Sequence, residues 1–215
     1  MKICFLFSNF HLTNLTAEPK MALKLAQEVS KNGHEVHIIS NNSENVSEKK
    51  ENVHLFLFNG LGDLKTYLIN TLKIIQYLAK VKPEILHVHG GIIIIYAWCI
   101  NLFLKVPLVF TFCESLDSFG ELQKKLLLFC LSRINLIFVT SSYLKNQLVL
   151  SGISKKGIMV ARLGLEDKFL KIKRIQKINT DIFFFGDSSR ERGFDIVYSL
   201  AREMQNLVFT ILVRW

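Results

Sequence analysis

Short apolar runs alternate along the chain with segments in which apolar residues recur at helical spacing. The runs typical of strands are residues 3–7, 34–40, 53–58, 85–89, 108–112, 136–139 and 157–162. The segments with helical spacing are residues 21–29, 64–78, 92–104, 119–131 and 140–152. This alternation predicts an α/β fold with a doubly wound parallel sheet, because successive parallel strands are joined by helices that cover both faces of the sheet.

The pattern begins again near the C-terminal end of the sequence. A strand is predicted at 181–185, a loop at 186–193, a helix at 194–204 and a strand at 207–213. The sequence thus predicts a first domain over 1–167, a basic linker over 168–180 and an incomplete second domain over 181–215. A single βαβ unit buries little apolar surface. We therefore expect residues 181–215 either to pack against another protein surface or to be only partly folded.

Composition places the protein among folded globular chains. Half of its 215 residues are apolar, which excludes disorder as the main state. The net charge is +9, from 27 basic and 18 acidic residues, and the excess is C-terminal. Five cations fall in the linker, where they indicate a solvated segment or an attraction to phosphates or anionic lipids. They are Lys168, Lys171, Lys173, Arg174 and Lys177.

Cysteine spacing and hydropathy predict a location. The four cysteines, which form no C-x-x-C pair, suggest neither a disulfide framework nor a zinc site. The apolar run 92–104 is shorter than the ~20 residues that cross a bilayer. The chain opens directly as a strand, without the pattern of a secretory leader. We expect a cytoplasmic protein, peripheral on the inner face of the membrane at most, with no nucleic-acid partner.

Side chains that could take part in catalysis or metal binding lie at or just after the ends of two predicted strands. His87 and His89 point to one side of their strand, where His89 is either an active-site residue or a packed histidine. The pair would bind zinc only with a third ligand, and none is evident, so no metal is predicted. Glu114 follows the strand 108–112 and is either a general base, a contact to a substrate hydroxyl or a solvated acid. Cys113 could be a nucleophile only beside a base.

A second candidate site lies in the loop 186–193. Gly186 ends a strand, Arg190 and Arg192 follow, and Gly193 opens a helix. Guanidinium groups at a helix N-terminus can form a binding site for pyrophosphate, although the negative charges of Asp187 and Glu191 weaken the positive electrostatic field there. No dinucleotide fingerprint and no P-loop occurs. The alternative is an exposed loop without a ligand.

Several short motifs follow one another in a recognisable order. They are Gly33-His34-Glu35-Val36, Ile85-Leu86-His87-Val88-His89-Gly90, Val109-Phe110-Thr111, Ser141-Ser142, Gly152-Ile153, Gly164-Leu165-Glu166-Asp167-Lys168-Phe169, Phe184-Phe185-Gly186 and Arg192-Gly193-Phe194-Asp195. In order and spacing they resemble the family 4 glycosyltransferases over nearly the whole chain. The resemblance implies a GT-B fold, in which two Rossmann-like domains hold the acceptor and the nucleotide sugar. It also implies retention at the anomeric carbon, with no cofactor and no obligatory metal.

The resemblance also assigns residues. Arg192 stands where the family has a lysine on the donor pyrophosphate, and Gly186 matches the glycine that ends the first strand of the second domain. Asp187 replaces a usual arginine. Cys113 and Glu114 stand where the family presents a histidine and an acid. A later pair of family glutamates, which holds the sugar and the ribose, has no counterpart in the chain, so the resemblance implies a C-terminally truncated and inactive form.

These observations predict a glycosyltransferase that moves a hexose from a nucleotide sugar to a glycolipid or polysaccharide acceptor of the cell envelope. Contact with an anionic membrane is expected through basic residues on apolar helices, unless these lysines only line packed helices. The residues are Lys65, Lys73, Lys124, Lys125 and Arg133. One alternative is a non-catalytic remnant that binds acceptor or a separate C-terminal domain. Another is an unrelated doubly wound enzyme with acid-base chemistry at His89 and Glu114.

Overall fold

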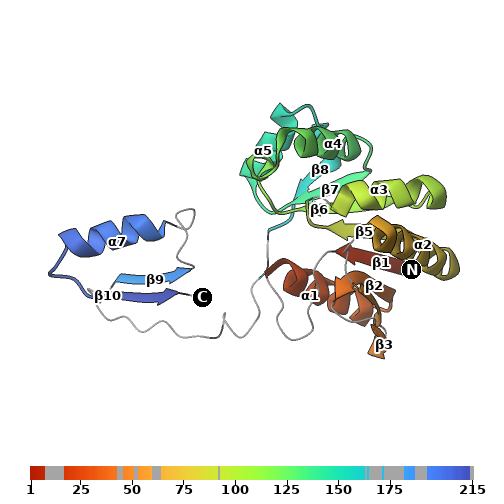
Figure 1. The fold of residues 1–215 in the computed structure, drawn as a ribbon, viewed down its shortest axis with the longest axis horizontal. Helices are drawn as coiled ribbons and strands as arrows, with labels where there is room; N and C mark the ends of the chain where they lie inside the picture. Colours follow the sequence, from red (N-terminus) through yellow and green to blue (C-terminus); the bar gives the residue numbers. More distant parts are fainter. Residues whose placement is uncertain are drawn as a thin grey trace. The chain divides into compact units, whose positions relative to one another are not determined.

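A computed structural model describes residues 1–7, 17–42, 46–50, 53–59, 64–91, 93–162, 164, 171, 182–186 and 193–213 (Figure 1). The chain divides into two compact units, Met1–Gly164 and Leu165–Trp215. The first unit is an α/β domain whose strands and helices alternate as predicted. Of the predicted basic linker, all but Lys171 lies outside the described residues.

One sheet of eight strands forms the centre of the first unit. The strands are β1 (Lys2–Phe7), β2 (Glu35–Asn42), β3 (Val46–Lys50), β4 (Val53–Asn59), β5 (Ile85–His89), β6 (Leu108–Phe112), β7 (Leu136–Val139) and β8 (Ile158–Val160). Their order is β3-β4-β2-β1-β5-β6-β7-β8, and every strand except β3 is parallel to its neighbours. The predicted doubly wound parallel sheet, Rossmann-like in its topology, is therefore confirmed.

Helices connect these strands and cover both faces of the sheet. They are α1 (Ala17–Lys31), α2 (Leu64–Val81), α3 (Ile93–Leu104), α4 (Glu121–Leu131) and α5 (Ser142–Leu150), with short 3₁₀ turns η1 (Leu116–Ser118) and η2 (Lys155–Gly157). The predicted start of α4 at Phe119 is two residues early, because the backbone first completes η1. Among the described helices, none combines the length and apolar character that crossing a bilayer requires.

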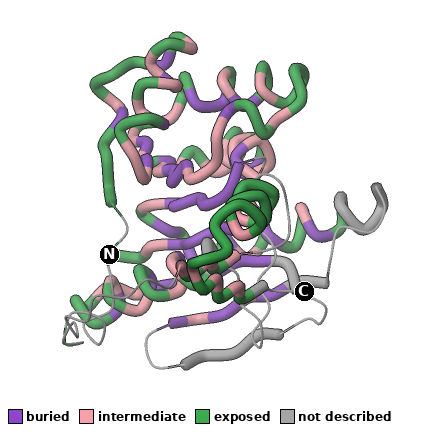
Figure 2. The backbone as a smooth tube through the Cα atoms, turned by 90° about the vertical axis from the view of Figure 1, so that its left-hand side faces the viewer, coloured by how far each residue is buried: buried purple, intermediate pink, exposed green. Residues whose placement is uncertain are grey.

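The side chains of β1 show how the core is divided. Cys4 and Leu6 pack on one face of the sheet, in a cluster that includes residues of α2 and α3. Phe5 and Phe7 pack on the other face, against Ala22 and other residues of α1. A strand buried on both faces is mostly apolar, which is why the end of β1 is a continuous run of apolar residues. In Figure 2 the buried residues follow the strands of this sheet.

The second unit contains a βαβ unit. The strand β9 (Ile182–Gly186) and the strand β10 (Phe209–Val213) pair in parallel, and the helix α7 (Phe194–Glu203) joins them. These strands form a sheet of their own. The further interpretation of this unit as a donor-side domain stays a prediction.

Candidate functional site

The sheet of the first unit changes its winding direction between β1 and β5. From β1 the chain proceeds to β2 on one side, whereas β5, β6, β7 and β8 follow one another on the other side. In open parallel sheets, ligands bind at the carboxyl ends of the strands at such a switch point. Phe7 and His89 are register partners at the ends of these two strands. The predicted site residue His89 therefore lies at the switch point.

The two histidines of β5 lie on one side of the strand, as the sequence predicted. Their ring centroids are 4.3 Å apart, and His87 Nε2 is 2.8 Å from the hydroxyl oxygen of Thr111 on β6. His89 is only 1% exposed and lies near the rings of Phe5 and Phe7. No described residue makes a hydrogen bond to either ring nitrogen of His89. Because buried polar groups are nearly always satisfied, His89 is suited to a hydrogen bond with a ligand.

Burial controls the ionisation of both rings. It lowers the pKa of His89 to about 4, and it lowers the pKa of His87 well below the usual value, with the nearby His89 adding to the effect. At neutral pH both imidazoles are therefore uncharged. A neutral imidazole can offer one nitrogen as a donor and the other as an acceptor, which suits recognition of a hydroxyl group.

The loop that follows β5 and His89 approaches the loop that follows β6 and contains Glu114. The two loops come together at Gly91. A Cβ atom on Gly91 would collide with the ring of Phe119 and would lie 2.9 Å from Glu114 Oε2. The missing side chain of Gly91 thus lets the half-buried Glu114 carboxylate approach the loop that follows β5. The structure brings the two predicted residues to neighbouring strand ends, while their catalytic roles stay predictions.

A small polar network fixes the loop after Glu114. The hydroxyl of Ser115 caps η1 by accepting from the Asp117 backbone amide at 3.3 Å. Gln147 on α5 accepts from the Leu116 amide at 3.0 Å and donates to Asp117 Oδ2, also at 3.0 Å. Sequence reasoning named none of these contacts. The Ser-x-Asp turn after a strand is a local capping signal, but Gln147 is more than 30 residues away along the chain.

The second predicted site belongs to the other unit. Gly186 ends β9, as predicted, and Gly193 has φ 76° at the N-cap of α7. A left-handed φ of this kind favours glycine. Arg190 and Arg192 lie outside the described residues, so the pyrophosphate-binding site stays a prediction.

In the described part of the chain, possible metal ligands gather away from the switch point. Within the described ranges, the only group of three or more histidine, cysteine or acidic side chains close enough to share an ion is Glu35, His37 and His54. His87 and His89 are not part of it.

Comparisons with known proteins extend this description. The model of a family described as Glycosyltransferase Family 4 matches residues 20–168, which is more than half of the chain. Anabaena Alr3699/HepE, solved in complex with UDP, has a TM-score of 0.71 at 11% identity. The lipopolysaccharide outer core galactosyltransferase WaaB, in its apo form, has a TM-score of 0.67 at 13% sequence identity. UDP-GlcNAc 2-epimerase from Methanocaldococcus jannaschii has a TM-score of 0.63 at 17% sequence identity.

The alignment with HepE covers 98% of this chain and 69% of HepE, and the alignment with WaaB covers 98% of this chain and 68% of WaaB. The alignment with the epimerase covers 99% of this chain and 66% of the epimerase. The chain thus spans about two thirds of the length of these structures. At such low identity the likeness shows a shared fold. No match was found among curated proteins.

Proposed function

Because the chain belongs to glycosyltransferase family 4, we propose that it takes part in transferring a hexose from a nucleotide sugar to a glycolipid or polysaccharide acceptor. The observation that carries this proposal is the meeting of Glu114 with Gly91 beside the switch point of the sheet. It provides a carboxylate just after β6, and the neighbouring strand β5 ends with a neutral buried imidazole, at the edge of the sheet where the fold is suited to hold a ligand. The nucleotide UDP in the HepE structure supports a UDP-linked donor.

Each unit has a different role in this proposal. In the first unit, Glu114 accepts a hydrogen bond from an acceptor hydroxyl and takes its proton as the hydroxyl oxygen bonds to C1 of the sugar. The bond between C1 and the donor phosphate breaks in the same reaction, and the nucleoside diphosphate leaves. His89 holds a second hydroxyl. In the second unit, the amide groups near Gly186 and the guanidinium groups of Arg190 and Arg192 bind the donor pyrophosphate. We expect the reaction to need neither a cofactor nor an obligatory metal.

The acceptor is proposed to be lipid-linked and to be met at an anionic membrane. Helix α4 exposes a stripe formed by Leu122, Leu126 and Phe129, with Lys125 and Arg133 beside it. The Arg133 guanidinium carbon lies 3.6 Å from the centroid of the Phe129 ring. An exposed apolar stripe flanked by cations favours the headgroup region of an anionic bilayer.

One experiment tests both halves of the proposed function, using the protein at its full encoded length. The transfer rate with UDP-hexoses and GDP-hexoses is measured for wild type and Glu114→Gln, with donor binding followed by calorimetry. Loss of a general base lowers kcat about 10²- to 10⁴-fold while donor affinity is kept. Glu121→Gln, an exposed acid in the first turn of α4, is the matched control and should retain wild-type kcat.

The donor half is tested in the same assay with Arg192→Ala. Losing a hydrogen bond to a charged phosphate costs about 1.5–3 kcal/mol, which weakens donor binding by at least ~10-fold. Arg202→Ala, an exposed arginine in the last turn of α7, should bind the donor like wild type. A protein that binds no nucleotide sugar, or whose kcat is indifferent to Glu114→Gln, would refute the assignment.

A further inference from the structure

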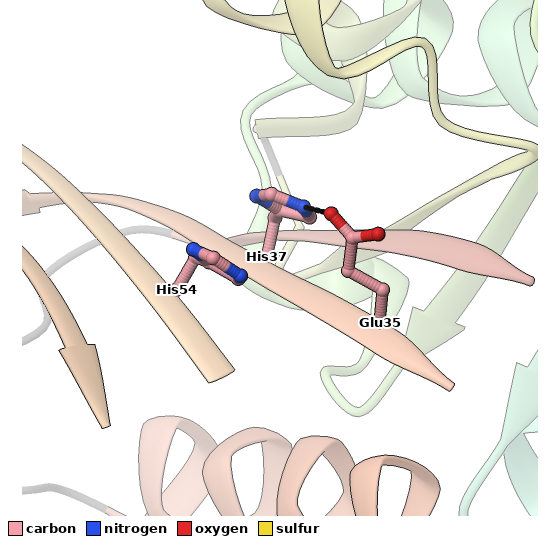
Figure 3. Close-up of side chains that lie close together, drawn as sticks. All are labelled: Glu35, His37 and His54. Carbon is pink, nitrogen blue, oxygen red and sulfur yellow. Dashed lines mark hydrogen bonds and ion pairs between the residues drawn. The ribbon is translucent and has the colours of Figure 1, made fainter. Parts of the chain in front are cut away.

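Three side chains of metal-binding type meet near the amino ends of β2 and β4, away from the site at the carboxyl ends. Glu35 and His37 lie on β2, and His54 lies on β4 as the register partner of His37. Figure 3 shows the three side chains beside one another on the two neighbouring strands. Each offers one ligand atom, and all three atoms lie within 4.8 Å of one another. The arrangement therefore combines the ligand types that zinc prefers with a short separation.

One of the three side chains in this group is buried and held by its neighbours, and another is exposed to solvent. His37 is 4% exposed, and its ring stacks on that of His54 with centroids 4.5 Å apart and an interplanar angle of 12°. Its Nε2 atom lies 2.9 Å from Glu35 Oε1. The Glu35 side chain is 42% exposed, so water can reach the carboxylate. A metal ion here would have a fixed protein wall and room for a water ligand.

Neighbouring residues orient two of the three ligands. Tyr77 on α2 places its hydroxyl oxygen 2.8 Å from His37 Nδ1. When Nδ1 donates its proton to that oxygen, the lone pair of Nε2 faces Glu35, and a zinc-bound histidine is held in the same way. Lys2 Nζ lies 3.6 Å from Glu35 Oε2, the carboxylate oxygen that does not contact His37. Glu35 can therefore bind a metal through Oε1 while Lys2 holds Oε2.

The hydrogen bond between Glu35 and His37 accounts for the contact between these two side chains. It does not account for the second imidazole, that of His54, which stacks on the His37 ring.

We propose that Glu35 Oε1, His37 Nε2 and a ring nitrogen of His54 bind one zinc ion, with water completing a tetrahedron. Ligand atoms of a tetrahedral zinc ion with bonds of about 2.0–2.1 Å lie ~3.3 Å apart. Glu35 Oε1 and His37 Nε2, which are now 2.9 Å apart, must therefore separate slightly, and His54 must move closer. His54, which is only half-buried, can turn toward the other two ligands. The bound ion would tie β2 to β4, and through Tyr77 to α2, far from the carboxyl-end site. The proposal goes beyond the proposed function and does not depend on it.

Zinc titration of the full chain by calorimetry tests the site. We expect one ion per chain, and at least ~10-fold weaker binding in Glu35→Gln, His37→Ala and His54→Ala. His34→Ala is the matched control, because it removes a histidine one residue before Glu35 but outside the group; it should bind zinc like wild type. Tyr77→Phe removes only the hydroxyl that orients His37 and should weaken binding about 10- to 100-fold.

A second measurement separates these ligands from the four cysteines and does not require any variant to fold. Cobalt(II), a spectroscopic substitute for zinc, should give the visible bands of a tetrahedral site without a thiolate charge-transfer band. A thiolate band, an absence of stoichiometric binding, or equal losses in His34→Ala and the ligand variants would overturn the proposal.

Discussion

The imidazole of His89 is buried without a hydrogen-bond partner in the described part of the chain, and this makes its protonation costly. It lies 5.9 Å from the ring of Phe5 and 6.4 Å from the ring of Phe7, between centroids. Burial lowers the pKa of His89 to about 4, whereas an unfolded chain titrates histidine near 6.5. Between these two values the unfolded state binds more protons than the folded state. Stability is therefore complete above pH ~6.5 and falls as the pH drops toward 4.

We predict that His89→Asn reduces this acid sensitivity. At pH 4.5 the two pKa values correspond to roughly 2–3 kcal/mol of lost stability from His89 alone. The difference in the free energy of unfolding between pH 7 and pH 4.5, measured with urea, should be smaller in the variant by roughly that amount. His87 shifts in the same direction, so some sensitivity should remain.

The control for this prediction is Val88→Ala, which lies on the same strand with its side chain in the core on the other face of the sheet. It should lower stability by the same amount at both pH values. If His89→Asn kept the full pH dependence of wild type, the acid sensitivity would have to arise elsewhere.

Individual elements differ in how clearly the sequence predicts them. The seven parallel strands are apolar runs because most of their side chains are buried, and sequence reasoning predicted all seven. It missed β3, whose sequence Val-Ser-Glu-Lys-Lys has one apolar residue and three charges. This strand pairs only with β4, antiparallel, at the edge of the sheet. Charged residues are common on edge strands, where they discourage pairing with other chains.

Sequence reasoning placed two candidate residues at strand ends but did not predict the side chains around them. The pattern placed His89 and Glu114 at strand ends, and β5 and β6 are indeed neighbours. It could not predict that β1 lies beside β5, so that Phe5 and Phe7 cover the histidines. It also could not predict that a side chain at Gly91 would crowd Glu114, because close approach between loops depends on strand order rather than on local spacing.

The exposed apolar stripe of helix α4, with the cations beside it, leads to a prediction about membrane binding. Reversing two charges, in Lys125→Glu with Arg133→Glu, should weaken binding to phosphatidylglycerol vesicles. Each basic residue near an anionic surface is worth about 1 kcal/mol, so the loss should be at least ~30-fold. Co-sedimentation with vesicles at fixed salt concentration measures it.

The matched control reverses two exposed lysines of η2, Lys155 and Lys156, which changes the net charge by the same amount. This variant should bind nearly like wild type. Equal weakening in both variants would mean that binding follows net charge. Equal binding of wild type to phosphatidylcholine vesicles would exclude the electrostatic explanation.

The two units of the molecule differ in how their sheets are covered. In the first unit, apolar clusters lie on both faces of the sheet. In the second unit, Phe184 of β9 approaches Phe194 of α7, with ring centroids 6.0 Å apart. The neighbouring Phe183 and Phe185 are 60% and 79% exposed. Since side chains alternate along a strand, α7 covers one face of this small sheet and leaves the other open.

Adjacent substitutions on β9 should therefore have opposite outcomes in the full chain. Phe184→Ser removes an aromatic contact with α7 and should speed amide exchange in β9 and β10 by at least ~10-fold, because local opening becomes easier. Phe185→Ser exposes no new surface and should leave that exchange unchanged, while reducing aggregation through the open apolar face. Hydrogen exchange followed by mass spectrometry resolves the two strands. If Phe185→Ser accelerated exchange as much as Phe184→Ser, then the face with Phe185 would be covered in solution, because a partly exposed cross-strand pair contributes less to stability than a buried aromatic side chain.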